Sequence, residues 1–176
     1  AKAALDKVTQ IEPMFYPAWR WKGKLLTQGL KKHSEALLAY QKAIQSQEDN
    51  STLYIEQGDV LSDLRRYEEA INSYSQGINR NPYLFGYINR GNAYIALNYY
   101  DKAIADYNKA ITLQPNFALA YTNRGNVYKD LKQYDKAIVD YNKAIALEAD
   151  FALAYYNRGS AYVVLKQFDR AIADYN

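Results

Sequence analysis

The chain has 176 residues with a formal net charge of +3, and 15% of its residues are aromatic. A net charge this small, with no block of like charges, offers no basic footprint for nucleic acid, and no apolar run approaches the roughly 20 residues that a membrane-spanning helix needs. We therefore expect neither nucleic acid nor a membrane as a partner. Because the chain has no cysteine, no disulfide framework identifies its compartment, and the cytoplasm is our expectation.

The sequence repeats itself. Residues 87–111, YINRGNAYIALNYYDKAIADYNKAI, align without a gap with residues 121–145, YTNRGNVYKDLKQYDKAIVDYNKAI, and the two segments are identical at 18 of 25 positions. A glycine recurs at spacings of 33, 34 and 34 residues, as Gly58, Gly91, Gly125 and Gly159. Such a period predicts stacked supersecondary repeats, each of which packs mainly on its neighbours.

Numbering this glycine as position 8 divides the chain into a single array of repeats. In chain order we expect a half repeat with only a second helix at 1–15, full repeats at 16–50, 51–83, 84–117 and 118–151, and a truncated repeat at 152–176. The repeat at 16–50 has one inserted residue, which we place in the turn between its helices. Because both ends stop within a repeat, we expect a fragment of a longer array whose ends associate with neighbouring molecules.

Each full repeat predicts two helices. Positions 4, 7, 8 and 11 share one face of a first helix, and positions 20, 24, 27, 28 and 31 share one face of a second helix. Pro82 and Pro115 follow two of the second helices and end them. No segment alternates with a period of two, so we expect an all-α chain without a sheet.

A 34-residue unit with an aromatic residue at position 4, Gly at 8, Tyr at 11, Ala at 20, Tyr at 24, Ala at 27 and Pro at 32 resembles the tetratricopeptide repeat (TPR). The resemblance covers the whole chain. It implies a right-handed superhelical solenoid of antiparallel helix pairs, whose first helices line a concave groove that binds a peptide or protein segment. Local departures are Lys22, Gln57 and three arginines at position 7, and Glu48 and Ala149 at position 32.

Helix geometry identifies the side chains that would face this groove. At about 100° per residue, positions 2, 6, 9 and 13 lie opposite the buried face of the first helix. We expect the groove to be aromatic and basic at first, then acidic, then neutral, which would favour one register of a ligand, unless the charges serve only solubility. Our candidate binding residues are Trp21, Lys24, Glu56, Asp59, Asp63, Phe85, Asn89, Asn92, Leu119, Asn123, Asn126, Leu153 and Asn157.

Three asparagines occupy position 6 at the repeat spacing: Asn89, Asn123 and Asn157. An amide both donates and accepts hydrogen bonds, so this row could pair with the backbone of an extended peptide whatever its sequence. The row resembles the asparagine ladder of TPR-containing glycosyltransferases. The alternative is that these residues are only solvated groove residues.

Position 2 carries information about partners. Phe85, Leu119 and Leu153 stand there, and with Val164 they leave apolar surface that marks an interaction site or packs against the adjacent repeat. None of the position-2 residues is a lysine. The clamp by which TPR domains hold the C-terminal carboxylate of chaperones is therefore absent, and we do not expect that class of partner.

Positions 7 and 23 change together from repeat to repeat. The pairs are Arg90 with Asp106, Arg124 with Asp140, Arg158 with Asp174, Gln57 with Ser73, and Lys22 with Ala39. We predict that the Arg–Asp pairs join the two helices of a repeat, because pairing lets an arginine bury its stem without leaving an unpaired charge.

The sequence contains no recognisable catalytic or metal site. His33, the only histidine, falls in a helix–helix turn, and a metal site needs several convergent ligands. There is no nucleophile–base pair and no phosphate-binding loop. We therefore expect no enzyme and no cofactor, but a scaffold that binds a protein or an extended peptide. The alternatives are a recruiting arm of a larger enzyme, such as a glycosyltransferase or kinase, and a self-assembling structural module.

Overall fold

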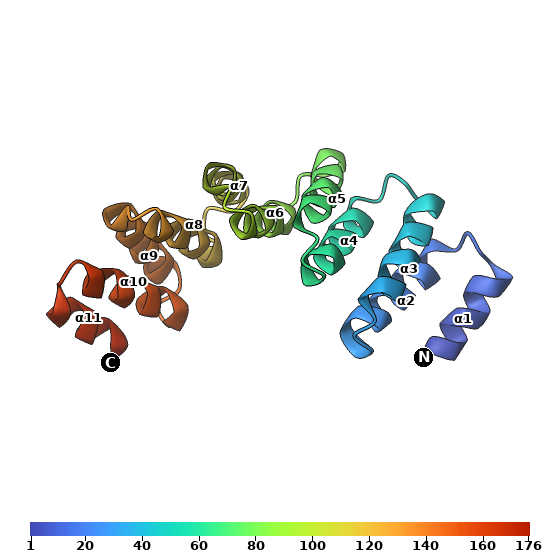
Figure 1. Ribbon diagram of the computed structural model, residues 1–176, viewed down its shortest axis with the longest axis horizontal. Helices are drawn as coiled ribbons and strands as arrows, with labels where there is room; N and C mark the ends of the chain where they lie inside the picture. The colour runs from blue at the N-terminus through green and yellow to red at the C-terminus, as the bar shows by residue number, and fades with distance from the viewer. The chain divides into compact units, whose positions relative to one another are not determined.

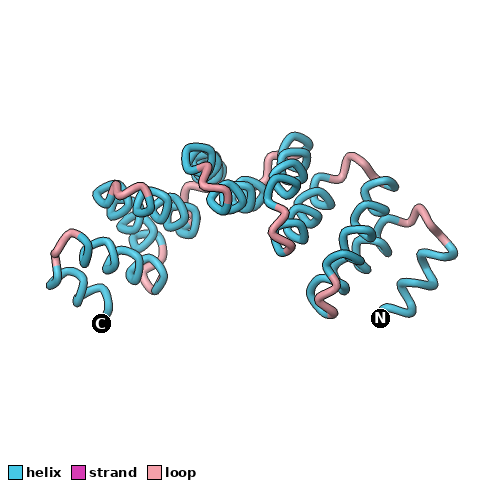
Figure 2. Tube along the Cα trace, in the orientation of Figure 1, coloured by secondary structure: helices cyan, strands magenta, loops and turns pink.

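The computed structural model covers all 176 residues, and every regular element in it is helical. Eleven α-helices follow one another along the chain (Figure 1). One π-helix lies between the second and the third. Figure 2 shows short loops between the helices and no strand. The predicted all-α fold is confirmed. The chain forms two compact units, which we call unit 1 (Ala1–Leu97) and unit 2 (Asn98–Asn176).

Unit 1 is built from helices that pack on their neighbours in sequence. Its elements are α1 (Lys2–Ile11), α2 (Tyr16–Lys24), the π-helix η1 (Leu25–Gly29), α3 (His33–Ser46), α4 (Ser51–Asp63), α5 (Tyr67–Arg80) and α6 (Leu84–Ala96). α2 packs on α3 and α4 packs on α5, and α3 and α5 in turn pack on α4 and α6. This arrangement of neighbouring pairs is the one that the repeat predicts.

Unit 2 follows the same plan. Its elements are α7 (Tyr100–Leu113), α8 (Ala118–Asp130), α9 (Tyr134–Leu147), α10 (Ala152–Val164) and α11 (Phe168–Tyr175). α8 packs on α9, α9 on α10, and α10 on α11. The repeat predicted at 84–117 begins in unit 1 and ends in unit 2. The limits of the sequence repeats stay a prediction.

The turn that follows each first helix has a recurring backbone geometry. One residue adopts the left-handed conformation, with φ between 56° and 60°: Lys31, Arg65, Asn98, Lys132 and Lys166. In the α4–α5 turn the N–H of Arg66 then donates to the carbonyl of Leu61 at 2.9 Å. This bond satisfies a carbonyl at the end of the first helix, as in a Schellman motif.

The extra residue of the segment 16–50 lies in a helix rather than in the turn where we placed it. Lys31 follows Gly23 by eight residues, whereas Arg65 follows Gly58 by seven. Within η1 the N–H of Leu30 donates to the carbonyl of Leu25, five residues earlier, at 3.1 Å. A π-turn absorbs one residue without breaking the helix, so the turn that follows keeps the common geometry.

A glycine and a tyrosine set the distance between paired helices. A Cβ atom at Gly58 would lie 2.5 Å from Cε1 of Tyr74, and one at Gly125 would lie 2.7 Å from Cε1 of Tyr141. Both tyrosines are fully buried. Position 8 must therefore be glycine so that the tyrosine at position 24 can lie flat against the first helix.

Candidate binding surface

Side chains from successive first helices of unit 1 meet along a common surface. Arg20 on α2 forms a bidentate pair with Glu56 on α4, with Nη2–Oε1 at 2.7 Å and Nε–Oε2 at 2.9 Å. Asn89 on α6 donates from Nδ2 to Oδ1 of Asp59 on α4 at 2.8 Å. We call the exposed face of α2, α4 and α6 the first-helix surface of unit 1. It brings together candidate residues at positions 6 and 9.

Glu56 is neutralised by two cations. Besides the bidentate pair with Arg20, Nζ of Lys24 lies 3.0 Å from Oε1 of Glu56. The hydrogen bond to Glu56 raises the pKa of Arg20, so this guanidinium stays charged. The sequence predicted that the acidic part of the groove includes Glu56, but its charge is already balanced within the protein. Arg20 was missed because it stands at position 5, where most repeats have an uncharged residue.

Asp59 and Asp63 keep their negative charge available on this surface. Asp59 accepts a hydrogen bond from Oη of Tyr74 at 2.9 Å in addition to the one from Asn89. Asp59 reaches solvent, but the protein atoms around it remove part of its hydration, and this desolvation raises the pKa of its carboxyl group. The hydrogen bonds from Tyr74 and Asn89 lower the pKa, but by less. Oδ2 of Asp63 lies 3.4 Å from Nε2 of His33, and the Asp63 side chain is 55% exposed.

His33 is more than a surface residue of a turn. It begins α3, is half-buried, and faces Asp63 at the end of α4. The sequence placed it correctly beside the turn but gave no sign of this contact, since the two residues are far apart in the chain.

Trp21 and a hollow beside it form the aromatic part of the surface. The Trp21 side chain is 64% exposed, and Nζ of Lys24 lies 5.5 Å from its ring centroid. A cavity of about 480 Å³ lies next to it, with Leu5 and Leu25 among its lining residues. On α6 the ring of Phe85 is exposed and lies 5.5 Å from that of Tyr83. Exposed rings of this kind supply large contact areas to partners.

The first helices of unit 2, α8 and α10, carry uncharged side chains at positions 6 and 9. Oη of Tyr141 donates to Oδ1 of Asn126 at 2.8 Å, and Nζ of Lys129 donates to Oδ1 of Asn157 at 3.4 Å. Asn157 is only 6% exposed, and its Nδ2 has no hydrogen-bond partner. Leu119 and Asn123 are half-buried, and Leu153 is exposed.

The predicted asparagine row is divided between the units. Asn89 lies in unit 1, where its Nδ2 bonds to Asp59, whereas Asn123 and Asn157 lie in unit 2. Asn92 on α6 is exposed and takes part in an interaction of its own. The row as one continuous ligand site therefore stays a prediction.

Two of the predicted Arg–Asp pairs are confirmed. Arg124 contacts Asp140 at 2.8 Å (Nε–Oδ2) and 2.6 Å (Nη2–Oδ1), and Arg158 contacts Asp174 in the same way. The hydrogen bond to Asp140 raises the pKa of Arg124. Arg90 and Asp106 belong to different units, so their pair stays a prediction.

Each paired arginine also contacts the preceding second helix. Nη1 of Arg124 donates to Oδ1 of Asn108 at 2.6 Å, and Nη1 of Arg158 contacts Asn142 in the same way. Arg124 also lies against the rings of Tyr121 and Tyr128, with its Cζ 5.7 Å and 6.0 Å from their centroids. The sequence predicted the aspartate partner but not these contacts, which join one repeat to the next.

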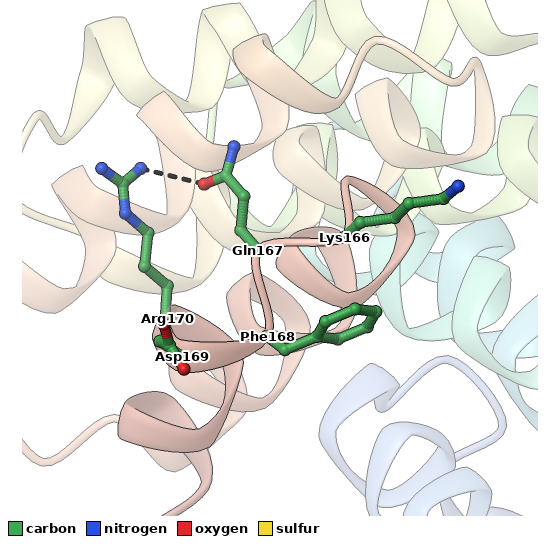
Figure 3. Close-up of a pocket in the computed structure, with 5 residues that line it drawn as sticks. All are labelled: Lys166, Gln167, Phe168, Asp169 and Arg170. Carbon is green, nitrogen blue, oxygen red and sulfur yellow. Dashed lines mark hydrogen bonds between the residues drawn. The ribbon is translucent and has the colours of Figure 1, made fainter.

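A hollow at the α10–α11 turn carries no function that we can assign. Its lining is five consecutive residues, Lys166 to Arg170, and within it Nη1 of Arg170 donates to Oε1 of Gln167 at 2.9 Å (Figure 3). Elsewhere, no group of three or more His, Cys, Asp or Glu residues is placed to hold a metal ion. None of the helices combines the length and the apolar character needed to cross a bilayer.

Family models match most of the repeated part of this sequence. Residues 91–132 and 125–166 match the TPR repeat, and residues 51–83 match the tetratricopeptide repeat. No curated protein gives a significant sequence match.

Solved structures share the fold. MamA is 28% identical, with 86% of this chain and 88% of that chain covered and a TM-score of 0.77. A tetratricopeptide repeat protein from Parabacteroides merdae ATCC 43184 is 24% identical, with 99% and 69% covered and a TM-score of 0.86. YrrB, described as a TPR protein with an unusual peptide-binding site, is 19% identical, with 99% and 90% covered and a TM-score of 0.77.

Proposed function

Since this chain belongs to the tetratricopeptide-repeat family, we propose that it is a protein-interaction scaffold whose first-helix surfaces bind a peptide or protein segment. The observation that carries the proposal is the exposed Trp21 beside an apolar hollow, on the same surface as the carboxylates of Asp59 and Asp63. In this proposal the chain holds a partner and catalyses no reaction.

Trp21 is the proposed anchor for an apolar side chain of the partner. A few large side chains, tryptophan among them, supply most of the binding energy at an interface when they lie at a contact from which water is displaced. The cavity lined by Leu5 and Leu25 offers such a hollow next to the Trp21 ring. A partner segment with an aliphatic or aromatic side chain at this point would bury both apolar surfaces.

The carboxylates on α4 supply the proposed charge preference. Arg20 and Lys24 outnumber Glu56 by one positive charge, so the negative charge of the surface comes from Asp59 and Asp63. A lysine or arginine of the partner would be attracted there, and a like-charged residue would be repelled. We therefore propose a partner segment in which an apolar residue is accompanied by a basic one.

The first helices of unit 2 are proposed as a second contact surface, made of neutral groups. Leu119, Asn123, Asn126 and the exposed Leu153 would contact the partner's side chains and backbone. Asn157 would contribute least, because it is almost fully buried.

The proposal is tested by selecting binders from a random peptide library with the wild-type chain. Selected peptides should combine an apolar residue with Lys or Arg. The substitution Trp21→Ala should weaken their binding by about 2 kcal/mol, as measured by isothermal titration calorimetry. The matched control is Leu38→Ala, which removes an exposed apolar side chain from α3 outside this surface. Peptides that bind both variants equally well would contradict the proposal.

A further inference from the structure

A second hollow in unit 1 lies between α3, α4 and α5, apart from the first-helix surface. Its volume is about 210 Å³, and its polar lining includes Gln41, Gln57 and Ser73, with Leu61 at its side. None of these residues takes part in the proposed peptide site. The hollow therefore needs an explanation of its own.

The lining residues occupy the positions that surround an arginine in unit 2. Position 7 is Gln57 here and Arg124 there, and position 23 is Ser73 here and Asp140 there. Position 25 of the preceding repeat is Gln41 here, whereas in unit 2 it is the Asn108 that bonds to Arg124.

Position 11 changes with them: Leu61 stands where unit 2 has Tyr128 against the arginine. Lys22, the position-7 residue of the first full repeat, likewise reaches back to position 25 of the preceding repeat, with Nζ 2.6 Å from Oδ1 of Asp6. Gln57 instead accepts a hydrogen bond from Ser73 at 2.9 Å. The shorter side chains at these positions leave a polar cavity at the place that corresponds to the guanidinium of Arg124.

The charges at the rim of the hollow also differ from those at the equivalent positions of unit 2. Glu69 stands at position 19, where unit 2 has Lys136, and it pairs with Arg66 at 2.6 Å. The rim charges of this hollow therefore cancel, whereas Arg124, Asp140 and Lys136 together leave one positive charge. One guanidinium group in the hollow would restore both the shape and the charge of the unit 2 arrangement.

We infer that this hollow binds a guanidinium group, supplied by an arginine side chain of a partner or by a free arginine-like molecule. The amide oxygens of Gln41 and Gln57 and the hydroxyl of Ser73 accept its N–H groups, and the planar group lies against Leu61. A lysine ammonium fits less well, because it is a compact, strongly hydrated charge that lacks the planar fork of donors.

Nuclear magnetic resonance titration of the full chain tests this inference. N-acetyl-arginine amide should shift the side-chain amide signals of Gln41 and Gln57 in a saturable way, and N-acetyl-lysine amide should not. Free arginine and an arginine-containing tripeptide are titrated as well. Binding of the tripeptide identifies a partner's side chain as the source, and binding of free arginine alone identifies the small molecule.

Variants taken from the chain's own repeats provide the controls. Gln57→Arg combined with Ser73→Asp places the unit 2 pair in the hollow and should weaken binding by about tenfold or more. If the double variant does not fold, Leu61→Tyr replaces it in the test. This change introduces the tyrosine that unit 2 has at this position, narrows the hollow and should also weaken binding. Arg124→Gln, Asp140→Ser and Tyr128→Leu together should create a second guanidinium site in unit 2. Absence of saturable shifts, equal shifts with lysine, or unchanged binding in the filled variant would overturn the inference.

Discussion

At the scale of single residues, the contacts that distinguish one repeat from another are mostly electrostatic. Arg124 is held by Asp140 and Asn108, Lys22 reaches Asp6, and Gln57 bonds only to Ser73. The same position of the repeat thus serves in a largely buried ion pair, in a half-buried ion pair or in a neutral hydrogen bond. The fold tolerates each version because the partner residue changes with it.

Breaking the Arg124–Asp140 pair should be costly. Arg124→Gln alone leaves Asp140, whose side chain is 4% exposed, without its cation, and should lower the free energy of unfolding by about 3 kcal/mol. The double variant with Asp140→Ser reproduces the neutral combination of Gln57 and Ser73 and should recover about 1–3 kcal/mol of that loss. Urea unfolding measures both. Arg66→Gln, at the exposed Arg66–Glu69 pair, is the control and should cost less than about 1 kcal/mol.

Asp59 is predicted to destabilise the folded chain at neutral pH. Desolvation raises the pKa of Asp59 in the folded chain, so folding favours the protonated carboxyl group. The free energy of unfolding therefore falls as the pH rises from the pKa of the unfolded chain through the higher pKa of the folded chain. Asp59→Asn should remove this cost and keep the bond from Tyr74, as Asn126 keeps the bond from Tyr141.

Thermal unfolding at several pH values tests the prediction for Asp59. The variant should be more stable than the wild type near pH 7, and the two should converge below about pH 3, where the carboxyl group is mostly protonated in both states. A variant that is less stable at neutral pH would show that the charge of Asp59 strengthens its bonds to Tyr74 and Asn89 more than desolvation opposes it.

At the scale of helices, close packing between glycine and tyrosine decides the spacing of a pair. Gly125→Ala should lower the free energy of unfolding by about 1–3 kcal/mol, because the new Cβ would lie 2.7 Å from the buried ring of Tyr141. This loss outweighs the gain of about 1 kcal/mol that alanine brings to a helix. Gly29→Ala is the control, since its Cβ would meet only a flexible side-chain end of Leu25 at 3.2 Å. Equal effects in both variants would argue against a packing role for Gly125.

The sequence predicted those features that every repeat shares, and it missed those that depend on one combination of side chains. The helix pairs follow from periodicity, because the same small and large residues recur in register. The Arg20–Glu56 pair and the hollow beside Gln57 were not predicted. They depend on the lengths and rotamers of side chains from adjacent repeats, and a period does not encode these.

The π-helix η1 shows the same limit at the scale of one element. The sequence revealed an extra residue in the segment 16–50 but not its place. The left-handed residue Lys31 keeps the turn unchanged, so the extra residue is absorbed where the helix can widen by one residue, between Leu25 and Gly29.

At the scale of the whole molecule, stability is expected to be local, because each repeat packs mainly on its neighbours. Both tryptophans, Trp19 and Trp21, lie in α2, so tryptophan fluorescence reports on unit 1 alone, whereas far-ultraviolet circular dichroism reports on all helices. The two probes therefore separate local from global unfolding. The buried residues Tyr40 in unit 1 and Tyr141 in unit 2 are a matched pair for this purpose, because each lies against the position-8 glycine of its own repeat.

Tyr141→Ala should destabilise unit 2 by about 3–5 kcal/mol, the cost of removing a buried aromatic side chain. Its urea transition should move to lower concentration by circular dichroism, while the fluorescence transition should stay close to that of the wild type. Tyr40→Ala should move the fluorescence transition, because Tyr40 packs against Gly23 in the tryptophan-bearing helix. If both variants shifted both probes equally, the chain would unfold as one cooperative body. Damage to unit 2 would then also weaken the proposed peptide site around Trp21, whereas local stability predicts that this site still binds.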